Sequence, residues 1–255
     1  MYAEDELKAL GIDEDDLTEE ELLFLLAALH TTLTDLENEL RIFFQKYGKD
    51  GVITYAEVKK WVSSTNHTRR LTMLNYTVNE LFETGFNAFE RLFDNHLRTI
   101  VQREADFFGV KLDINDILNT PWGLDDCTWL QRLSAHRNRW INKINADLRV
   151  SFLKQDSVMD VLSQMADRGE SMDTILSRLW RTESNAISSI ARKDIFKQLG
   201  ATHYRFIHVD GCTCELCNDM HYQVFPISEY VVGITANPLH PNCKDRTEPV
   251  FDYLE

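Results

Sequence analysis

Apolar residues recur at intervals of three and four along most of the first 200 positions, which is the spacing of one face of an α-helix. The first run follows Thr-Glu-Glu-Glu at residues 18–21, a capping box that predicts a helix start near residue 18. The run stops at Gly48, so we expect a helix of about eight turns. Its apolar positions are Leu22, Leu25, Leu26, Leu29, Leu33, Leu36, Leu40 and Phe43.

Further helices are expected over residues 71–108, 128–154 and 157–199, the last ending at Gly200. Residues 71–108 carry a broad aromatic stripe, which is typical of a helix face buried in a core. Ser157 and Ser171 are suitable N-cap residues, and Gly169 lies between them. We therefore expect two helices in this last stretch.

The pattern changes after Gly200. Residues 204–209 are rich in aromatic and β-branched side chains and predict a strand, and residues 223–225 and 231–234 can form a hairpin. The expected fold class is mainly α, an elongated bundle of long helices followed by a small β-containing zinc-knuckle module. We expect three regions: an acidic arm with long helices over 1–109, a helical region over 110–200, and the β-rich module over 201–255.

Composition and charge narrow the function classes. The net charge is −14, and residues 1–40 hold thirteen acidic residues against one lysine. This acidic arm is either a solvated helix face or a docking surface for a basic partner. No basic stripe marks a dedicated nucleic-acid binder. No membrane-spanning run and no signal peptide are recognisable, so we expect a reducing cytoplasm, where clustered cysteines favour metal over disulfides.

The distinctive chemistry lies in residues 210–243, which hold four of the five cysteines. Cys214 and Cys217 have the two-residue gap that lets one turn present two sulfurs to one ion. His240 and Cys243 repeat this gap, with Pro241 stiffening the turn between them. Since a structural zinc site is closed by four thiolate or imidazole groups, these four residues are the expected ligands of Zn²⁺.

Several alternatives stay open at this cluster. Cys212 can replace His240 as the fourth ligand or stand aside, and Asp210 and His221 are near enough to support a ligand or replace one. The cysteines can also be reduced core residues or form a disulfide. Cys127 stands alone and is expected to be a buried apolar residue.

A catalytic zinc needs an open coordination position and a nearby carboxylate base. The cluster has some resemblance to zinc-stapled HNH nucleases, but four good ligands close the site. We therefore expect no catalytic residue, no organic cofactor and no enzymatic activity.

The last third of the chain resembles the head-morphogenesis, or minor head, proteins of tailed bacteriophages, the group similar to protein F of phage Mu. The resemblance covers residues 175–250. It rests on Arg181-Thr182-Glu183 in a long helix, Ala191-Arg192, Leu199-Gly200, Asp210, the Cys214 and Cys217 pair, Gln223-Val-Phe225, and Pro238-Leu-His240-Pro-Asn-Cys243. Two departures are Lys244-Asp245, where the family commonly has a basic residue and a further cysteine, and His221-Tyr222, where many members have Asp-Gly.

The resemblance implies a structural virion protein that acts in head assembly with portal, major capsid and scaffold proteins. It implies a location in the phage head, with host cytoplasm as the place of assembly, and no membrane. Arg181 and Glu183 then have a local structural or docking role, because residues two apart on a helix point in different directions. The alternative functions are a zinc-containing HNH-like nuclease and a packaging factor that contacts DNA.

Overall fold

The computed structural model describes residues 14–63, 65–209 and 214–251. It is mainly helical with a small C-terminal sheet, so the expected fold class is confirmed. The helices are α2 (Glu14–Tyr47), α3 (Tyr55–Ser63), α4 (Thr65–Phe108), α5 (Ile114–Leu118), α6 (Trp129–Lys154), α7 (Val158–Gln198) and α8 (Glu215–Met220). The strands are β1 (His203–Ile207), β2 (Val224–Pro226) and β3 (Arg246–Val250), with a short 3-10 helix, η1 (Ile227–Glu229), after β2.

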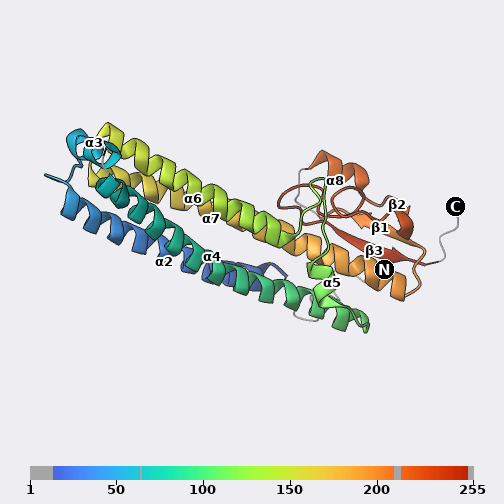
Figure 1. Ribbon diagram of the computed structural model, residues 1–255. Helices are drawn as coiled ribbons and strands as arrows, with labels where there is room; N and C mark the ends of the chain where they lie inside the picture. Colours follow the sequence, from blue (N-terminus) through green and yellow to red (C-terminus); the bar gives the residue numbers. More distant parts are fainter. Residues whose placement is uncertain (1–13, 64, 210–213, 252–255) are drawn as a thin grey trace. The chain divides into compact units, whose positions relative to one another are not determined.

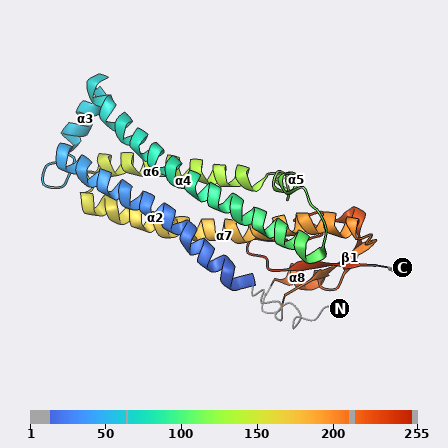
Figure 2. The ribbon, with the colours of Figure 1, turned by 90° about the horizontal axis from the view of Figure 1, so that it is seen from below.

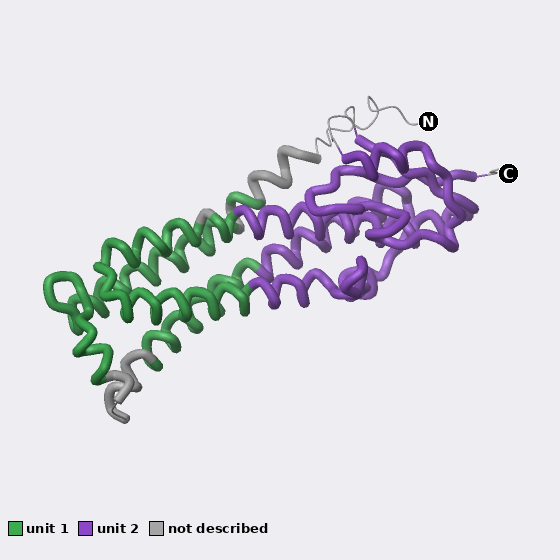
Figure 3. The backbone as a smooth tube through the Cα atoms, turned by 90° about the horizontal axis from the view of Figure 1, so that it is seen from above, with its two compact units in different colours: residues 1–89, 137–173 green, residues 90–136, 174–255 purple. Residues whose placement is uncertain are grey.

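The chain forms two compact units (Figure 3). Unit 1 comprises residues 1–89 and 137–173, and unit 2 comprises residues 90–136 and 174–255. The long helices α4, α6 and α7 therefore contribute residues to both units. The division expected from the sequence has its boundaries at residues 109 and 200, where the secondary structure changes. It stays a prediction.

Unit 1 is made of packed helices (Figure 2). The predicted stripe of α2 is buried at Leu22, Leu26, Leu29, Leu36 and Leu40. Aromatic side chains of α4 and α6 are buried in the same unit, as the periodicity predicts. α2 ends at Tyr47, next to the expected stop at Gly48.

The two helices expected over residues 157–199 are one helix, so this prediction is wrong. α7 runs for 41 residues and passes through both Gly169 and Ser171. Gly169 is a site of close packing, since a Cβ atom built there would lie 2.8 Å from Leu33 Cδ1. Because Gly169 has no side chain, α7 can approach Leu33 of α2 closely within unit 1. One glycine destabilises a long helix by only about 1 kcal/mol.

Unit 2 contains a three-stranded antiparallel sheet with the strand order β2-β1-β3 (Figure 1). Tyr204 of the central strand β1 pairs with Phe225 of β2 and with Pro249 of β3. The C-terminal part of α7 packs against this module, where the ring of Phe196 contacts that of Tyr230 edge-on.

The expected hairpin of residues 223–225 with residues 231–234 does not form, and this prediction is wrong. β2 pairs with β1 instead. Residues 231–236 close into a tight turn, in which Val231 O accepts hydrogen bonds from the backbone N–H groups of Ile234, Thr235 and Ala236. Gly233 has a φ of +86° there, a backbone conformation that ends an extended strand.

In the described parts of the chain, no helix combines the length and the apolar character needed to cross a membrane.

Candidate metal centre

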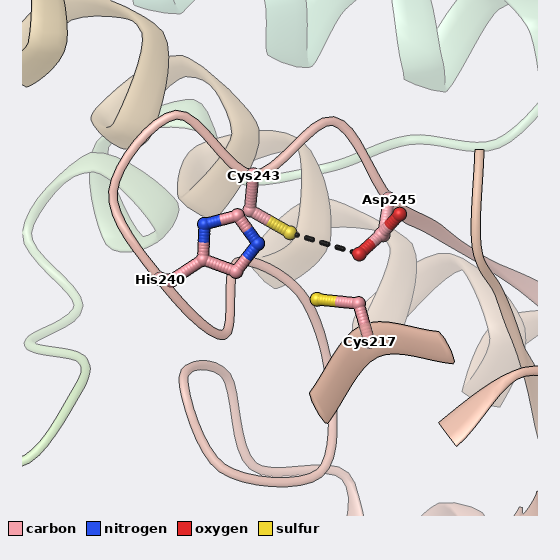
Figure 4. Close-up of side chains that lie close together, drawn as sticks. All are labelled: Cys217, His240, Cys243 and Asp245. Carbon is pink, nitrogen blue, oxygen red and sulfur yellow. Dashed lines mark hydrogen bonds between the residues drawn. The ribbon is translucent and has the colours of Figure 1, made fainter. Parts of the chain in front are cut away.

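Four side chains of unit 2 meet at one point: Cys217, His240, Cys243 and Asp245 (Figure 4). Each offers one ligand atom, and these atoms all lie within 4.8 Å of one another. Around a tetrahedral zinc ion, neighbouring ligand atoms are about 3.3–3.8 Å apart, given the usual bond lengths. A small inward movement of the side chains would reach that spacing, so this group can hold a metal ion.

Each ligand is positioned by a different local feature. Cys217 lies in the first turn of α8, where it is fully buried against Phe206 of β1 and Cys243. His240 and Cys243 begin and end a tight turn, closed by a hydrogen bond from Cys243 N to His240 O. Asp245 immediately precedes β3. The sheet and α8 thus bring together residues 28 positions apart in the sequence.

The ring of His240 is oriented for a metal. Its Nδ1 lies 2.9 Å from Pro241 O, and a carbonyl there can only accept, so Nδ1 carries the hydrogen. Nε2 is buried and has no hydrogen-bond partner among the described residues. Figure 4 shows a ring nitrogen of His240 facing the sulfur of Cys243. An imidazole held in this tautomer presents a free lone pair to an ion.

The thiols of Cys217 and Cys243 lie close to the carboxylate of Asp245. Burial raises the pKa of the Cys217 thiol above its ordinary value, and burial raises that of Cys243 to about 12. Burial also acts to raise the pKa of Asp245, but hydrogen bonds from Cys217, Val209 N, Cys243 and His208 outweigh it, and the pKa is lowered. Without a metal, neutral thiols therefore donate to an ionised carboxylate.

Helix α7 holds the ligand turn from one side. Thr182 Oγ1 accepts a hydrogen bond of 3.1 Å from Asn242 N, the residue before Cys243. Asn185 Nδ2 donates to the backbone carbonyl groups of Cys243 and Asp245. These contacts fix the backbone on both sides of Cys243.

Glu183 lies between Thr182 and Asn185 in the sequence but makes different contacts. It is 1% exposed and accepts hydrogen bonds from Trp122 Nε1 at 2.8 Å and from Arg132 Nη1 at 3.0 Å. Burial raises the pKa of Glu183 even though Arg132 acts to lower it. Arg132 also binds Asp125 and stacks on the Trp122 ring. Glu183 therefore anchors the loop before α6.

The structure brings together three of the four expected ligands, Cys217, His240 and Cys243. Cys214 is at the N-cap of α8, where it is partly buried and packs against the cluster of Phe206, Cys217 and Cys243. Its sulfur is not in the group of four ligand atoms. The alternate ligand Cys212 and the acceptor Asp210 lie outside the described residues.

The other expected site residues have structural contacts. His221 Nδ1 accepts a hydrogen bond from His208 N, and the His221 ring packs on Tyr222. Arg181 lies on the exposed side of α7, away from the buried Glu183. Cys127 is only partly buried, and its thiol contacts Asp125 O.

Asp245, Thr182 and Asn185 are the functional residues that the sequence reasoning missed. A signal for Asp245 exists, because alternate residues of an extended chain face the same side and Asp245 is two residues after Cys243. Thr182 and Asn185 carry no such signal, since their partners are 58 to 60 residues away.

Comparisons with protein-family models, with curated proteins and with solved structures found no match for this chain.

Proposed function

We propose that this chain is a minor head protein of a tailed bacteriophage, a structural virion component that works with portal and capsid proteins during head assembly. What supports the proposal most is one contact. Two of the stretches that carry the resemblance, 181–183 and 238–243, lie against each other through the hydrogen bond from Asn242 N to Thr182 Oγ1. If these stretches belong to one structural module that the chain shares with that family, they are expected to contact each other in the fold.

The proposed ion is Zn²⁺, with a structural role. Thiolate and imidazole ligands suit zinc, and four protein groups complete a tetrahedral site without an open position for water. The module that the ion would hold has three short strands and a six-residue helix. Such a small module gains folding free energy directly from a bound metal. The chain is accordingly proposed to have no catalytic activity.

Co-expression with the portal protein encoded in the same genome tests the assembly role. The expected result is a complex of the two proteins that survives affinity purification and size-exclusion chromatography, and the presence of the chain in purified virions. Failure to co-purify with portal protein or procapsids would contradict the proposal.

Two assays with the purified protein separate the alternatives. Metal-dependent DNA cleavage that is lost in His240→Ala would instead establish a nuclease. Duplex binding that weakens steeply with salt would instead establish a packaging factor.

A further inference from the structure

We infer that the fourth ligand of this centre is the carboxylate of Asp245 and not the thiolate of Cys214, so that the ion is held by two sulfurs, one nitrogen and one oxygen. The inference rests on the metal-binding part of the proposed function and is independent of the role in head assembly. It changes the expected chemistry of the centre, because a carboxylate is a harder ligand than a thiolate.

The orientation of Asp245 is fixed by its surroundings. Oδ1 accepts hydrogen bonds from His208 Nδ1 at 2.8 Å and from Val209 N at 3.0 Å. Oδ2 lies 3.2 Å from Cys243 Sγ, on the side of the sulfurs (Figure 4). The side chain of Asp245 is 0% exposed. One oxygen is thus engaged by the protein, and the other faces the centre.

Oδ2 needs a new partner when a metal binds. Its neighbour is the thiol of Cys243, which donates to Oδ2 while it carries hydrogen. A cysteine binds a metal as thiolate, so it has no hydrogen left to donate. Oδ2 would then be buried between anionic sulfurs with no partner, which is costly for a carboxylate. Coordination of the ion by Oδ2 removes this cost.

The charge balance favours Asp245 over Cys214. Two thiolates and one carboxylate leave a single excess negative charge around a divalent ion. Coordination by Cys214 as well would place a third thiolate beside the buried Asp245 and leave two excess charges. Like charges in such a site repel strongly, because little solvent is present to screen them.

The position of Cys214 agrees with this choice. It is partly exposed at the N-cap of α8, and its sulfur is not among the four ligand atoms that lie within 4.8 Å of one another. His208 is then the residue that orients the ligand, since it holds the carboxylate through Oδ1, as a ligand is commonly held by a neighbouring side chain.

X-ray absorption spectroscopy at the zinc edge tests the inference on the wild-type chain, where no variant can fail to fold. The expected result is two sulfur and two nitrogen or oxygen neighbours per zinc. Three sulfur neighbours would overturn the inference while leaving a metal-held module in place. A chain that binds no zinc would overturn both the inference and the metal-binding part of the proposed function.

Co²⁺ titration of two matched variants identifies the ligands. Asp245→Asn keeps the shape and the acceptor for Val209 N, and a loss of affinity of more than about a hundredfold is expected, since disturbing only a residue that supports a ligand costs about 10–100-fold. Cys214→Ser should leave the affinity and the sulfur-to-cobalt charge-transfer intensity unchanged. The opposite pattern, with weakening in Cys214→Ser alone, would assign Cys214 as the ligand.

Discussion

The backbone around Cys243 is held by three hydrogen bonds to two residues of α7: Thr182 accepts one, and Asn185 donates two. Asn242, whose backbone N–H donates to Thr182 Oγ1, has a φ of +60°, a conformation that asparagine adopts more readily than most non-glycine residues. The external acceptor therefore adds to a turn that the local sequence already allows. The geometry of the metal ligands depends on this support.

Thr182→Val should destabilise unit 2 and weaken metal binding, because the methyl group that replaces Oγ1 leaves Asn242 N without its acceptor. Because this hydrogen bond is exposed and water can replace the lost acceptor, a loss of about 0.5–1 kcal/mol is expected, the lower part of the net range for one hydrogen bond. Urea unfolding and zinc competition titration measure the two effects.

Thr182→Ser is the matched control, because it keeps the hydroxyl group that Asn242 N uses. It should retain most of the stability and affinity. Equal behaviour of the two variants would show that the hydroxyl group does not support the ligand turn.

Spacing predicts Cys214, Cys217, His240 and Cys243 as ligands, since one turn can present each pair to the ion, and the structure groups the last three of them. Spacing does not predict Asp245, because an aspartate after the last cysteine is consistent with an exposed loop as well as with a ligand. The role of Glu183 is also hidden in the sequence, since its partners Trp122 and Arg132 are 61 and 51 residues away.

Among the elements, α2 and α4 approach each other at Gly85 within unit 1. A Cβ atom built on Gly85 would lie 2.1 Å from Thr32 Oγ1 and 3.1 Å from Thr32 Cβ. A β-branched side chain on a helix has little rotamer freedom with which to move away. At Gly169 the nearest atom is instead the flexible end of Leu33.

Gly85→Ala should destabilise the protein by about 1–3 kcal/mol through overpacking, despite the better helix propensity of alanine. Gly169→Ala should cost clearly less. Urea unfolding of both variants compares them, and adding Thr32→Ala to Gly85→Ala should recover part of the loss. A stabilising effect of Gly85→Ala would contradict the close approach.

The start of α7 is stabilised by a reciprocal cap, as the sequence predicts for Ser157. Ser157 Oγ accepts from Asp160 N at 3.2 Å, and Asp160 Oδ2 accepts from the Ser157 hydroxyl and backbone N–H groups. The hydrogen bonds from Ser157 hold the pKa of Asp160 below its ordinary value.

A lowered pKa means that Asp160 stabilises the folded state above its unfolded pKa of about 3.9, and that this contribution is lost as pH falls through the lower folded value. In Ser157→Ala, the pKa of Asp160 should return toward its ordinary value, and the acid-dependent part of the stability should shrink. NMR titration of the Asp160 carboxyl group measures this directly. An unchanged pKa would exclude the cap as its cause.

Most of the helical structure is predictable, because long apolar stripes at helical spacing leave few alternatives. The break expected at Gly169 is wrong because a sequence does not distinguish a glycine that ends a helix from one that allows two helices to touch. The hairpin expected near residue 231 is wrong because its choice of partner strand depends on β1, which is distant in sequence.

For the whole molecule, the two units predict two responses to metal loss. The metal centre, the sheet and α8 all belong to unit 2, whereas α2 and α3 belong to unit 1. Cys243→Ser or chelation should unfold the C-terminal module, while most of the helical circular-dichroism signal remains. Cys127→Ser is the control, since this thiol contacts Asp125 O and not the centre. Equal thermal unfolding and zinc content in the two variants would contradict the role of the centre.

The proposed role in head assembly requires a folded C-terminal module, and that module is expected to need its metal ion. The metal content of the chain is therefore the quantity to measure. Native mass spectrometry of the full chain, purified without chelator from zinc-supplemented cells, measures this most directly. One zinc ion per chain is expected, retained in the wild type and lost in Cys243→Ser. A wild-type chain that is folded and metal-free in that spectrum would contradict the proposed metal centre.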